Sequence, residues 1–353
     1  MIQRIVLGCM ALMTWVTTSN AQYYNSALGK NGTVLKTALH NIIKNHSVGT
    51  YSDLWNYFNS TDNKVNGVVY DIYSDVPGST PPYIFILGSN QCGTYNQEGD
   101  CYNREHTWPS TFFGGNSPMY TDIQHIFPTD GWVNNKRGNL PYGKVKSGGV
   151  SWTSDNGSKT GSSLTYPGYV DDVFEPIDSF KGDLARVYFY MSTRYEGEDG
   201  GWSNWEMANG AELTPAAVTL LLTWHHLDPV SQKEINRNNA IYAIQNNRNP
   251  FIDYPIFADC IWGSSSCLSL NTHEIDLSSQ VKVFPNPAYG QLQLESPSDL
   301  SLTSYHLYSI LGNLVQEAPM KSSVIELQPS WHGQYILMLE SNKGVIRKLV
   351  SIQ

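Results

Sequence analysis

Two short segments of this sequence carry the side chains best suited to chemistry. The first, residues 103–109, places Glu105 next to His106, and the second, residues 128–139, holds Asn134 among further amides and two cations. A carboxylate oxygen and an amide oxygen are ligands for a hard cation such as Mg²⁺. A neutral imidazole readily takes a proton from water near neutral pH. Together these residue types could hold one metal ion, activate a water molecule and receive a phosphate.

The adjacency of Glu105 and His106 sets a condition on the local backbone. Successive side chains of a regular strand point to opposite faces, so both can serve one site only near a strand end or a kink. Pro109 follows closely and favours such an end. Residues 131–137 are predicted to form a short helix after a turn, which would present Asn134. Taken singly, these residues could equally be an ordinary surface pair and a capping Asn.

Two arginines could bind a substrate phosphate. Arg137 or Arg104 could do so with two parallel hydrogen bonds, but Arg137 could equally hold its helix in place from inside. Residues 107–127 contain no Arg or Lys. His125, close to the second segment, is predicted to support the imidazole or the amide ligand from behind.

The surrounding elements mix helices with short strands. Apolar residues recur at helical spacing in four segments, which are residues 29–60, 182–195, 213–227 and 232–245. Two β-rich runs, residues 68–73 and 83–87, are predicted to be strands. The Gly-, Ser- and Thr-rich residues 146–168 are predicted to form a polar loop, and residues 249–255 a turn. The predicted fold class is therefore α+β, with a small sheet around the two segments.

Other catalytic patterns are missing from the sequence. There is no Gly-x-Ser-x-Gly elbow and no His-Glu-x-x-His motif, which disfavours serine hydrolases and zinc peptidases. His225 and His226 are adjacent on a predicted helix, where neighbouring side chains diverge by roughly 100°. We therefore expect structural roles for both.

The N-terminus and the low charge indicate export. Residues 1–21 combine Arg4, an apolar run and small residues before Gln22, as in a secretory signal cleaved after Ala21; the run is too short to span a membrane. Only 15% of the 353 residues are charged, less than in most intracellular proteins. The net charge of −9 argues mildly against a nucleic-acid ligand, but a metal on Glu105 would make the local field positive.

Four cysteines remain after the signal segment, which favours disulfides in an exported chain. The sequence-local pairing joins Cys92 to Cys101 and Cys260 to Cys267. A zinc site built from all four thiolates is the alternative, although no Cys-x-x-Cys pair is present.

From residue 281 onward, short alternating strands separated by Gly, Pro and Ser turns predict a small β-sandwich. Residues 283–287, 307–312, 333–335 and 348–350 resemble the C-terminal sorting domains of type IX secretion substrates. The resemblance implies that the type IX machinery is a partner and exports the chain to the cell surface or medium. A carbohydrate-binding or adhesive β-module is the alternative.

Residues 103–143 resemble the endonuclease I family of His-Me finger (ββα-metal) nucleases. That family carries Glu-His followed by Pro, then Asp-Leu-x-x-Leu-x-Pro-x-x-Gly-x-x-Asn-x-x-Arg-x-Asn, to which residues 122–139 correspond. Further matches at residues 174–176, 182–191, 228–230 and 245–251 extend the similarity over about residues 30–263. Members of the wider family can place an Arg between the two motifs, and this chain has none there.

The resemblance implies that His106 is the general base and that Glu105 and Asn134 hold Mg²⁺, or else Ca²⁺ or Mn²⁺. Together with the N-terminal signal pattern and the C-terminal strand pattern, it predicts a signal peptide (1–21), a catalytic domain (22–268), a linker (269–280) and a sorting domain (281–353). We expect a secreted, monomeric, sequence-nonspecific endonuclease that cuts DNA, and RNA as a further substrate, to 5′-phosphate products. A non-catalytic nucleic-acid- or glycan-binding surface protein on the same scaffold is the alternative.

Overall fold

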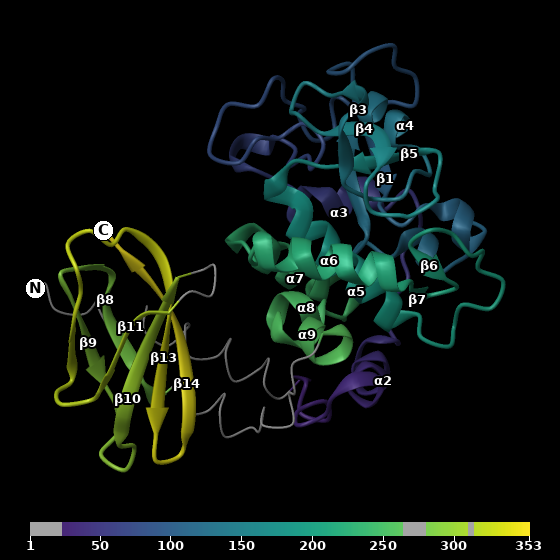
Figure 1. Cartoon of the computed structure of the whole chain (residues 1–353). Coiled ribbons are helices and arrows are strands. Elements are labelled where there is room, and N and C mark those ends of the chain that lie inside the picture. The colour runs from purple at the N-terminus through teal and green to yellow at the C-terminus, as the bar shows by residue number, and fades with distance from the viewer. Residues whose placement is uncertain (1–22, 264–279, 310–313) are drawn as a thin grey trace, which may run out of the picture. The chain divides into compact units, whose positions relative to one another are not determined.

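The computed structural model describes residues 23–263, 280–309 and 314–353. The chain divides into two compact units, of which the first comprises residues 31–266 and the second contains the C-terminal residues from 267 onward (Figure 1). The predicted signal segment, residues 1–21, and most of the predicted linker, residues 269–280, lie outside the described residues. So does Cys267, so its pairing with Cys260 remains a prediction.

The first unit is mainly helical. Its helices are α2 (Gly32–Ile43), α3 (Leu54–Thr61), α4 (Gly131–Arg137), α5 (Lys181–Arg194), α6 (Pro215–Leu227), α7 (Gln232–Gln245), α8 (Pro250–Asp253) and α9 (Ile256–Trp262). Short 3₁₀ turns lie at η1 (Val65–Gly67), η2 (Ser110–Phe113), η3 (Met119–Thr121) and η4 (Asp178–Phe180). The helices predicted at residues 182–195, 213–227 and 232–245 are confirmed.

Two of the predicted helical segments differ from the structure. Residues 29–60 form two helices rather than one, because Asp53 Oδ2 accepts a hydrogen bond from the Thr50 amide at 2.8 Å and closes a turn between them. The turn predicted at residues 249–255 contains α8, which the Asn249 side chain begins by accepting from the Phe251 amide at 3.0 Å.

Helix α5 passes through the interior of the first unit, and all of its side chains are buried. It packs against α6 and α2. Gly182 permits the close approach at its start, because a Cβ there would lie 2.0 Å from the Asp228 carbonyl oxygen.

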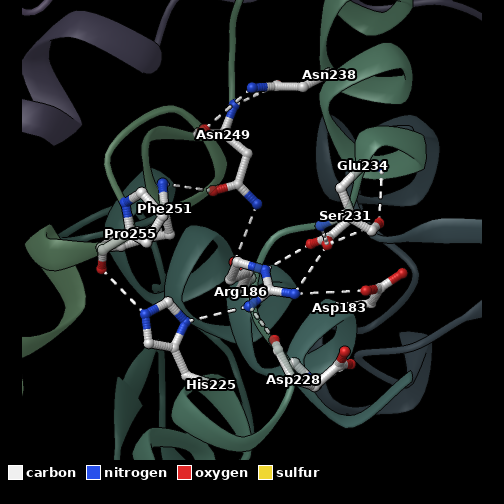
Figure 2. A network of polar contacts seen from close by, with 11 residues as sticks. Asp183, Arg186, His225, Asp228, Ser231, Glu234, Asn238, Asn249, Phe251 and Pro255 are labelled. Carbon is white, nitrogen blue, oxygen red and sulfur yellow. Dashed lines mark hydrogen bonds and ion pairs between the residues drawn. The ribbon is translucent and has the colours of Figure 1, made fainter. Parts of the chain in front are cut away.

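A buried polar network joins α5 to the helices that follow it (Figure 2). Arg186 contacts both carboxylate oxygens of Glu234, with Nε at 2.5 Å and Nη2 at 2.9 Å, and its Nη1 donates to the Asp228 carbonyl at 2.8 Å. His225 lies between Arg186 and the Pro255 carbonyl. His226 contacts Asp259 instead, so the two adjacent histidines serve different partners, as expected.

The first unit contains three small sheets among its described residues. β1 (Tyr102–His106) pairs antiparallel with β2 (Ile126–Asp130), and β6 (Ala208–Asn209) pairs with β7 (Glu212–Leu213). The third sheet has the order β3 (Val145–Thr153), β4 (Lys159–Ser163), β5 (Asp172–Glu175).

The two further strands predicted in the first unit were wrong. Residues 68–73 and 83–87 form only isolated bridges, such as Val68 to Ile86. Residues 146–168 are not a plain polar loop, since they contain most of the β3–β4 hairpin. The many glycines and serines of these residues give no alternation of apolar and polar side chains, which is the pattern that predicts a strand. The strand β5, which pairs with β4, follows later in the chain.

The second unit is all-β, as predicted. Its strands are β8 (Lys282–Tyr289), β9 (Gln291–Glu295), β10 (Leu302–Ser309), β11 (Leu314–Pro319), β12 (Val324–Glu326), β13 (Gly333–Ser341) and β14 (Gly344–Ile352). They are hydrogen-bonded in the order β11-β10-β13-β14-β8-β9-β12. Apolar residues from both ends of this order form one core, which includes Leu292, Leu307, Ile325 and Leu339. The α+β fold class is therefore confirmed.

No helix in the described ranges is long and apolar enough to cross a membrane.

Candidate active site on a strand–strand–helix motif

The two chemical segments come together as a strand–strand–helix motif. β1 and β2 pair with Glu105 opposite Phe127 and His106 opposite Ile126. Helix α4 begins directly after β2, where the Asp130 side chain accepts from the Val133 amide at 2.9 Å. The helix packs against both strands, and these elements lie at one end of the first unit, with α2 at the other (Figure 1).

A disulfide fixes the chain just before β1. Cys92 and Cys101 are bonded, with their Cα atoms 5.7 Å apart, so this predicted pair is confirmed. Cys101 immediately precedes Tyr102, the first residue of β1, and the Tyr102 amide donates to the Asn90 carbonyl at 2.9 Å. The loop and the strand are thus tied together on both sides of the bridge.

Side chains two residues apart on β1 contact side chains about one turn apart on α4. Asn103 and Glu105 share one face of the strand, and Asn134 and Arg137 share one face of the helix. Asn134 Nδ2 donates to Asn103 Oδ1 at 2.7 Å, and Arg137 Nη1 donates to Glu105 Oε1 at 3.0 Å. These two parallel contacts place the two predicted metal ligands on the same strand–helix seam.

The hydrogen bonds at this seam determine which oxygen atoms remain free. The amide of Asn134 is oriented by its donation to Asn103, so its carbonyl oxygen Oδ1 is the end without a partner among the described residues. Both side-chain donors to Glu105, the Tyr73 hydroxyl at 2.8 Å and Arg137, contact Oε1. Oε2 has no side-chain partner in the described part of the chain. One carboxylate and one amide oxygen fit Mg²⁺, which keeps its other positions for water and phosphate.

Buried hydroxyl groups support Glu105 from behind. Because Tyr73 donates to the carboxylate, the Tyr142 hydroxyl at 2.6 Å from it must donate to Tyr73. Burial raises the pKa of Glu105 to about 7, although the Arg137 charge and the Tyr73 hydrogen bond act in the opposite direction. A cation held at Oε2 would keep this carboxyl group ionised.

Arg137 is placed as an internal support. It is completely buried, and it also donates to the carbonyl oxygens of His106 at 3.0 Å and Thr107 at 2.5 Å. Its guanidinium therefore ties α4 to the end of β1, and no part of it faces solvent. Of the two roles considered for this residue, the structure favours the internal one.

His106 is the last residue of β1, so the strand ends where the sequence indicated it should. Its Nε2 lies 3.1 Å from the carbonyl oxygen of Tyr120. A carbonyl oxygen can only accept, so Nε2 carries the hydrogen and Nδ1 carries the lone pair. Nδ1 has no hydrogen-bond partner among the described residues. Burial, followed by the nearby histidine His125, lowers the pKa of His106 to about 3, so the ring is neutral at ordinary pH.

The segment that supplies the Tyr120 carbonyl is itself held firmly. His125 Nε2 lies 2.8 Å from the Met119 carbonyl, and its ring centroid lies 5.5 Å from that of His106. His125 thus supports the segment rather than bonding to His106. Asp122, in the same segment, accepts from the hydroxyls of Tyr190 and Tyr195 at 2.8 Å each.

Arg104 lies on the opposite face of β1 from Glu105. Its guanidinium stacks on the ring of Tyr51, 3.6 Å from the centroid, and lies 4.3 Å from that of Trp55.

The sequence did not identify several supporting residues. Asn103 could have been found, because it precedes Glu105 by one strand repeat and so must share its face. Tyr73, Tyr142 and the Tyr120 carbonyl could not, since each comes from another segment and is placed by tertiary packing alone. Among the described residues, no group of three or more His, Cys, Asp or Glu side chains is placed to hold a metal ion.

Several known nucleases are similar to this chain. An Extracellular ribonuclease of Bacillus amyloliquefaciens is 37% identical over 249 residues, which is 68% of this chain and 78% of that protein. An Extracellular deoxyribonuclease of Aeromonas hydrophila is 26% identical over 135 residues, 38% of this chain and 50% of that protein. An Endonuclease-1 of Buchnera aphidicola is 28% identical over 132 residues, 37% of this chain and 46% of that protein.

Residues 282–353 match the family described as Secretion system C-terminal sorting domain, which covers all seven strands of the second unit. Residues 31–256 match the family described as Endonuclease I, and this range includes the entire strand–strand–helix motif. The chain therefore belongs to the endonuclease I family and carries a C-terminal sorting domain.

Proposed function

We propose that this chain is a secreted, metal-dependent endonuclease that hydrolyses phosphodiester bonds of DNA and RNA without sequence preference. The observation that carries the proposal is the hydrogen bond between His106 Nε2 and the Tyr120 carbonyl, which leaves Nδ1 free to accept a proton. The free oxygens of Glu105 and Asn134 lie on the adjoining strand–helix seam.

Each group has a separate role in this reaction. His106 Nδ1 takes a proton from a water molecule, whose oxygen attacks phosphorus while the bond to the 3′-oxygen breaks. The products carry a 5′-phosphate and, after the leaving oxygen takes a proton from solvent, a 3′-hydroxyl. Glu105 and Asn134 would hold Mg²⁺, with Ca²⁺ or Mn²⁺ as alternatives. When bound, the ion supplies positive charge to the phosphate oxygens as negative charge develops on them.

The choice of substrate follows from the nucleophile. Water attacks in this reaction, so the 2′-hydroxyl of RNA is not required and DNA is equally suitable. One relative is named an extracellular ribonuclease and another an extracellular deoxyribonuclease, which supports both RNA and DNA as substrates. Contacts to phosphate and metal carry no sequence information, so nonspecific cleavage is expected.

The sorting-domain match supports export. The chain is a secreted or cell-surface protein, and the type IX machinery is the proposed partner of residues 282–353. Degradation of nucleic acid outside the cell suits such a location.

A direct assay tests the activity. Purified chain is incubated with supercoiled plasmid and with a structureless RNA, each in millimolar Mg²⁺ and in EDTA. We expect both substrates to be cut only with metal, and the RNA fragments to carry 5′-phosphates and no 2′,3′-cyclic phosphate. Intact plasmid and RNA in Mg²⁺ would contradict the enzyme and leave the non-catalytic binding protein as the better hypothesis.

Matched histidine variants locate the base. His106→Ala should slow cleavage by at least about a hundredfold, the usual contribution of a general base, while binding and folding remain. His226→Ala removes a histidine from the exposed side of α6 and should cleave as the unmodified chain does. Equal rates for the two variants would remove His106 from this role.

A further inference from the structure

Arg104 is held rigidly between two aromatic rings. Its guanidinium carbon lies 3.6 Å from the ring centroid of Tyr51 and 4.3 Å from that of Trp55. Its Nη1 donates to the Tyr51 carbonyl at 2.8 Å, and its Nε is buried without a partner. The stacking and the hydrogen bond fix the plane of the guanidinium, so little side-chain freedom remains to be lost on binding a ligand.

Arg104 forms no ion pair with the described residues of the first unit. The other five arginines of residues 31–263 each pair with a carboxylate: Arg137 with Glu105, Arg186 with Glu234, Arg194 with Glu198, Arg237 with Asp62 and Arg248 with Asp253. No carboxylate among the described residues pairs with Arg104. An unpaired cation that is partly desolvated indicates an external anion.

Arg104 also lies on the same side of β1 as His106. Residues separated by one strand repeat share a face, about 7 Å apart along the strand. The contacts agree with this placement. The Tyr51 ring, on which the Arg104 guanidinium stacks, also stacks with the His106 ring, and the two ring centroids are 6.0 Å apart. A nucleic-acid strand that reaches His106 would therefore run beside Arg104.

We infer that Arg104 binds a backbone phosphate of the nucleic-acid substrate through its guanidinium group, beside His106. This assignment rests on the proposed function and supplies the cation that residues 107–127 lack. It also gives different roles to the two arginines that the sequence suggested for phosphate binding, since Arg137 is completely buried. The ligand class is a phosphodiester, so the contact is independent of base and of sugar.

Salt dependence of binding measures this contact without turnover. In a His106→Ala background, the affinity for a short fluorescent single-stranded DNA is measured over a range of KCl concentrations. Each neutralised phosphate contributes a slope of about 0.7 in log affinity against log salt for single strands. Arg104→Met keeps the side-chain length but removes the charge, so we expect the slope to fall by about 0.7 and the affinity at low salt to fall roughly tenfold.

Three further variants make the test specific. Arg104→Lys keeps the charge and should keep the slope. Lys44→Gln removes a positive charge that contacts the Asn41 side chain rather than a residue of the motif, and should leave the slope unchanged. Arg104→Gln serves as a second neutral variant, and thermal melting confirms which neutral variant folds.

A folded neutral variant whose slope equals that of its parent would overturn the inference and leave Arg104 with a packing role. If the His106→Ala parent binds neither DNA nor RNA, the proposed function itself fails, and this assignment fails with it. The two failures are therefore distinguishable.

Discussion

At the residue scale, the chemistry depends on which atom of each side chain its neighbours leave free. In each of the three site side chains, one polar atom is hydrogen-bonded to a backbone or side-chain partner, and the other polar atom has no side-chain partner among the described residues. The occupied atoms are His106 Nε2, Glu105 Oε1 and Asn134 Nδ2. The exposed atoms are therefore a basic nitrogen and two hard oxygens, and residues other than the predicted base and ligands make this selection.

Tyr73→Phe should weaken metal binding without removing a ligand. The change removes the hydroxyl that donates to Glu105 Oε1 and leaves the Tyr142 hydroxyl without its acceptor. Loss of such a supporting hydrogen bond typically costs about tenfold or more in metal affinity. Calorimetric titration with Mn²⁺ measures the change, and saturating metal should restore most of the cleavage rate.

Tyr166→Phe is the matched control for that variant. It removes another buried hydroxyl, which donates to the Tyr142 carbonyl at 2.7 Å, so a comparable loss of stability is expected with unchanged Mn²⁺ affinity. Equal Mn²⁺ affinity in Tyr73→Phe and the unmodified chain would show that the hydroxyl does not support the ligand.

The pH dependence of cleavage should follow Glu105 rather than His106. Burial lowers the pKa of His106 to about 3, so the base stays neutral and competent down to about pH 5. Burial raises the pKa of Glu105 to about 7, so the carboxylate needed for metal is lost as the pH falls below that value. We expect the acid limb to move to lower pH as Mg²⁺ is raised. A limb fixed near pH 6.5 at every Mg²⁺ concentration would mean that His106 titrates as an ordinary histidine.

At the element scale, the sequence predicted those elements whose signals are local. Helices α6 and α7 carry their own start signals, Pro215 after a capping Thr214 and a capping box between Ser231 and Glu234. The end of β1 was predicted from Pro109 and the strand alternation alone. The hairpin β3–β4 was not predicted, because β3 is mostly exposed and β4 is rich in small residues. The two strands acquire order by pairing with each other, and β4 also pairs with β5.

The position of the segment between β1 and β2 could not be predicted from the sequence. Residues 119–125 present the Tyr120 carbonyl to the base, but they are held by partners from α5 and α7 that follow much later in the chain. Arg237 on α7 donates to the carbonyl oxygens of Ile123 at 2.7 Å and Ile126 at 2.8 Å. The position of the catalytic nitrogen therefore depends on long-range packing.

Asp122 anchors this segment and should give the first unit a defined acid sensitivity. Burial alone would raise its pKa, but neighbouring histidines and the Gln245 amide hold it at about 2, below the ordinary 3.8. A depressed carboxyl pKa stabilises the fold above 3.8, and this stabilisation is lost as the pH falls through 2. The full contribution is about 2 kcal/mol, of which about 1 kcal/mol is lost between about pH 5 and pH 3.

Equilibrium unfolding of Asp122→Asn tests this value. The variant should be less stable at neutral pH by about 2 kcal/mol or more, because its amide would face the hydroxyl donors of Tyr190 and Tyr195. The difference from the unmodified chain should shrink by about 1 kcal/mol at about pH 3. Asp171→Asn, at an exposed position, should change stability by less than about 0.5 kcal/mol. A pH-independent difference for Asp122→Asn would show that this carboxylate does not titrate as described.

At the scale of the whole molecule, chemistry and export occupy separate units. Every residue assigned to the site lies between residues 51 and 142, within the family match of residues 31–256. The described core of the second unit is formed by that unit's own residues, from Val281 to Ile352. Clusters such as that of Leu54, Phe58 and Ile241 stabilise the first unit independently. Such separate cores are expected to unfold as separate cooperative units.

A chain shortened to residues 22–268 should therefore keep its nuclease activity. This form retains Cys260 and Cys267 and removes the seven-stranded unit. We expect kcat/KM on plasmid DNA within about twofold of the full chain, since no described site residue is lost. Scanning calorimetry of the full chain should show two transitions, of which the shortened form keeps one at the same temperature. Loss of activity or of that transition would contradict this prediction and mean that the sorting domain stabilises the catalytic unit.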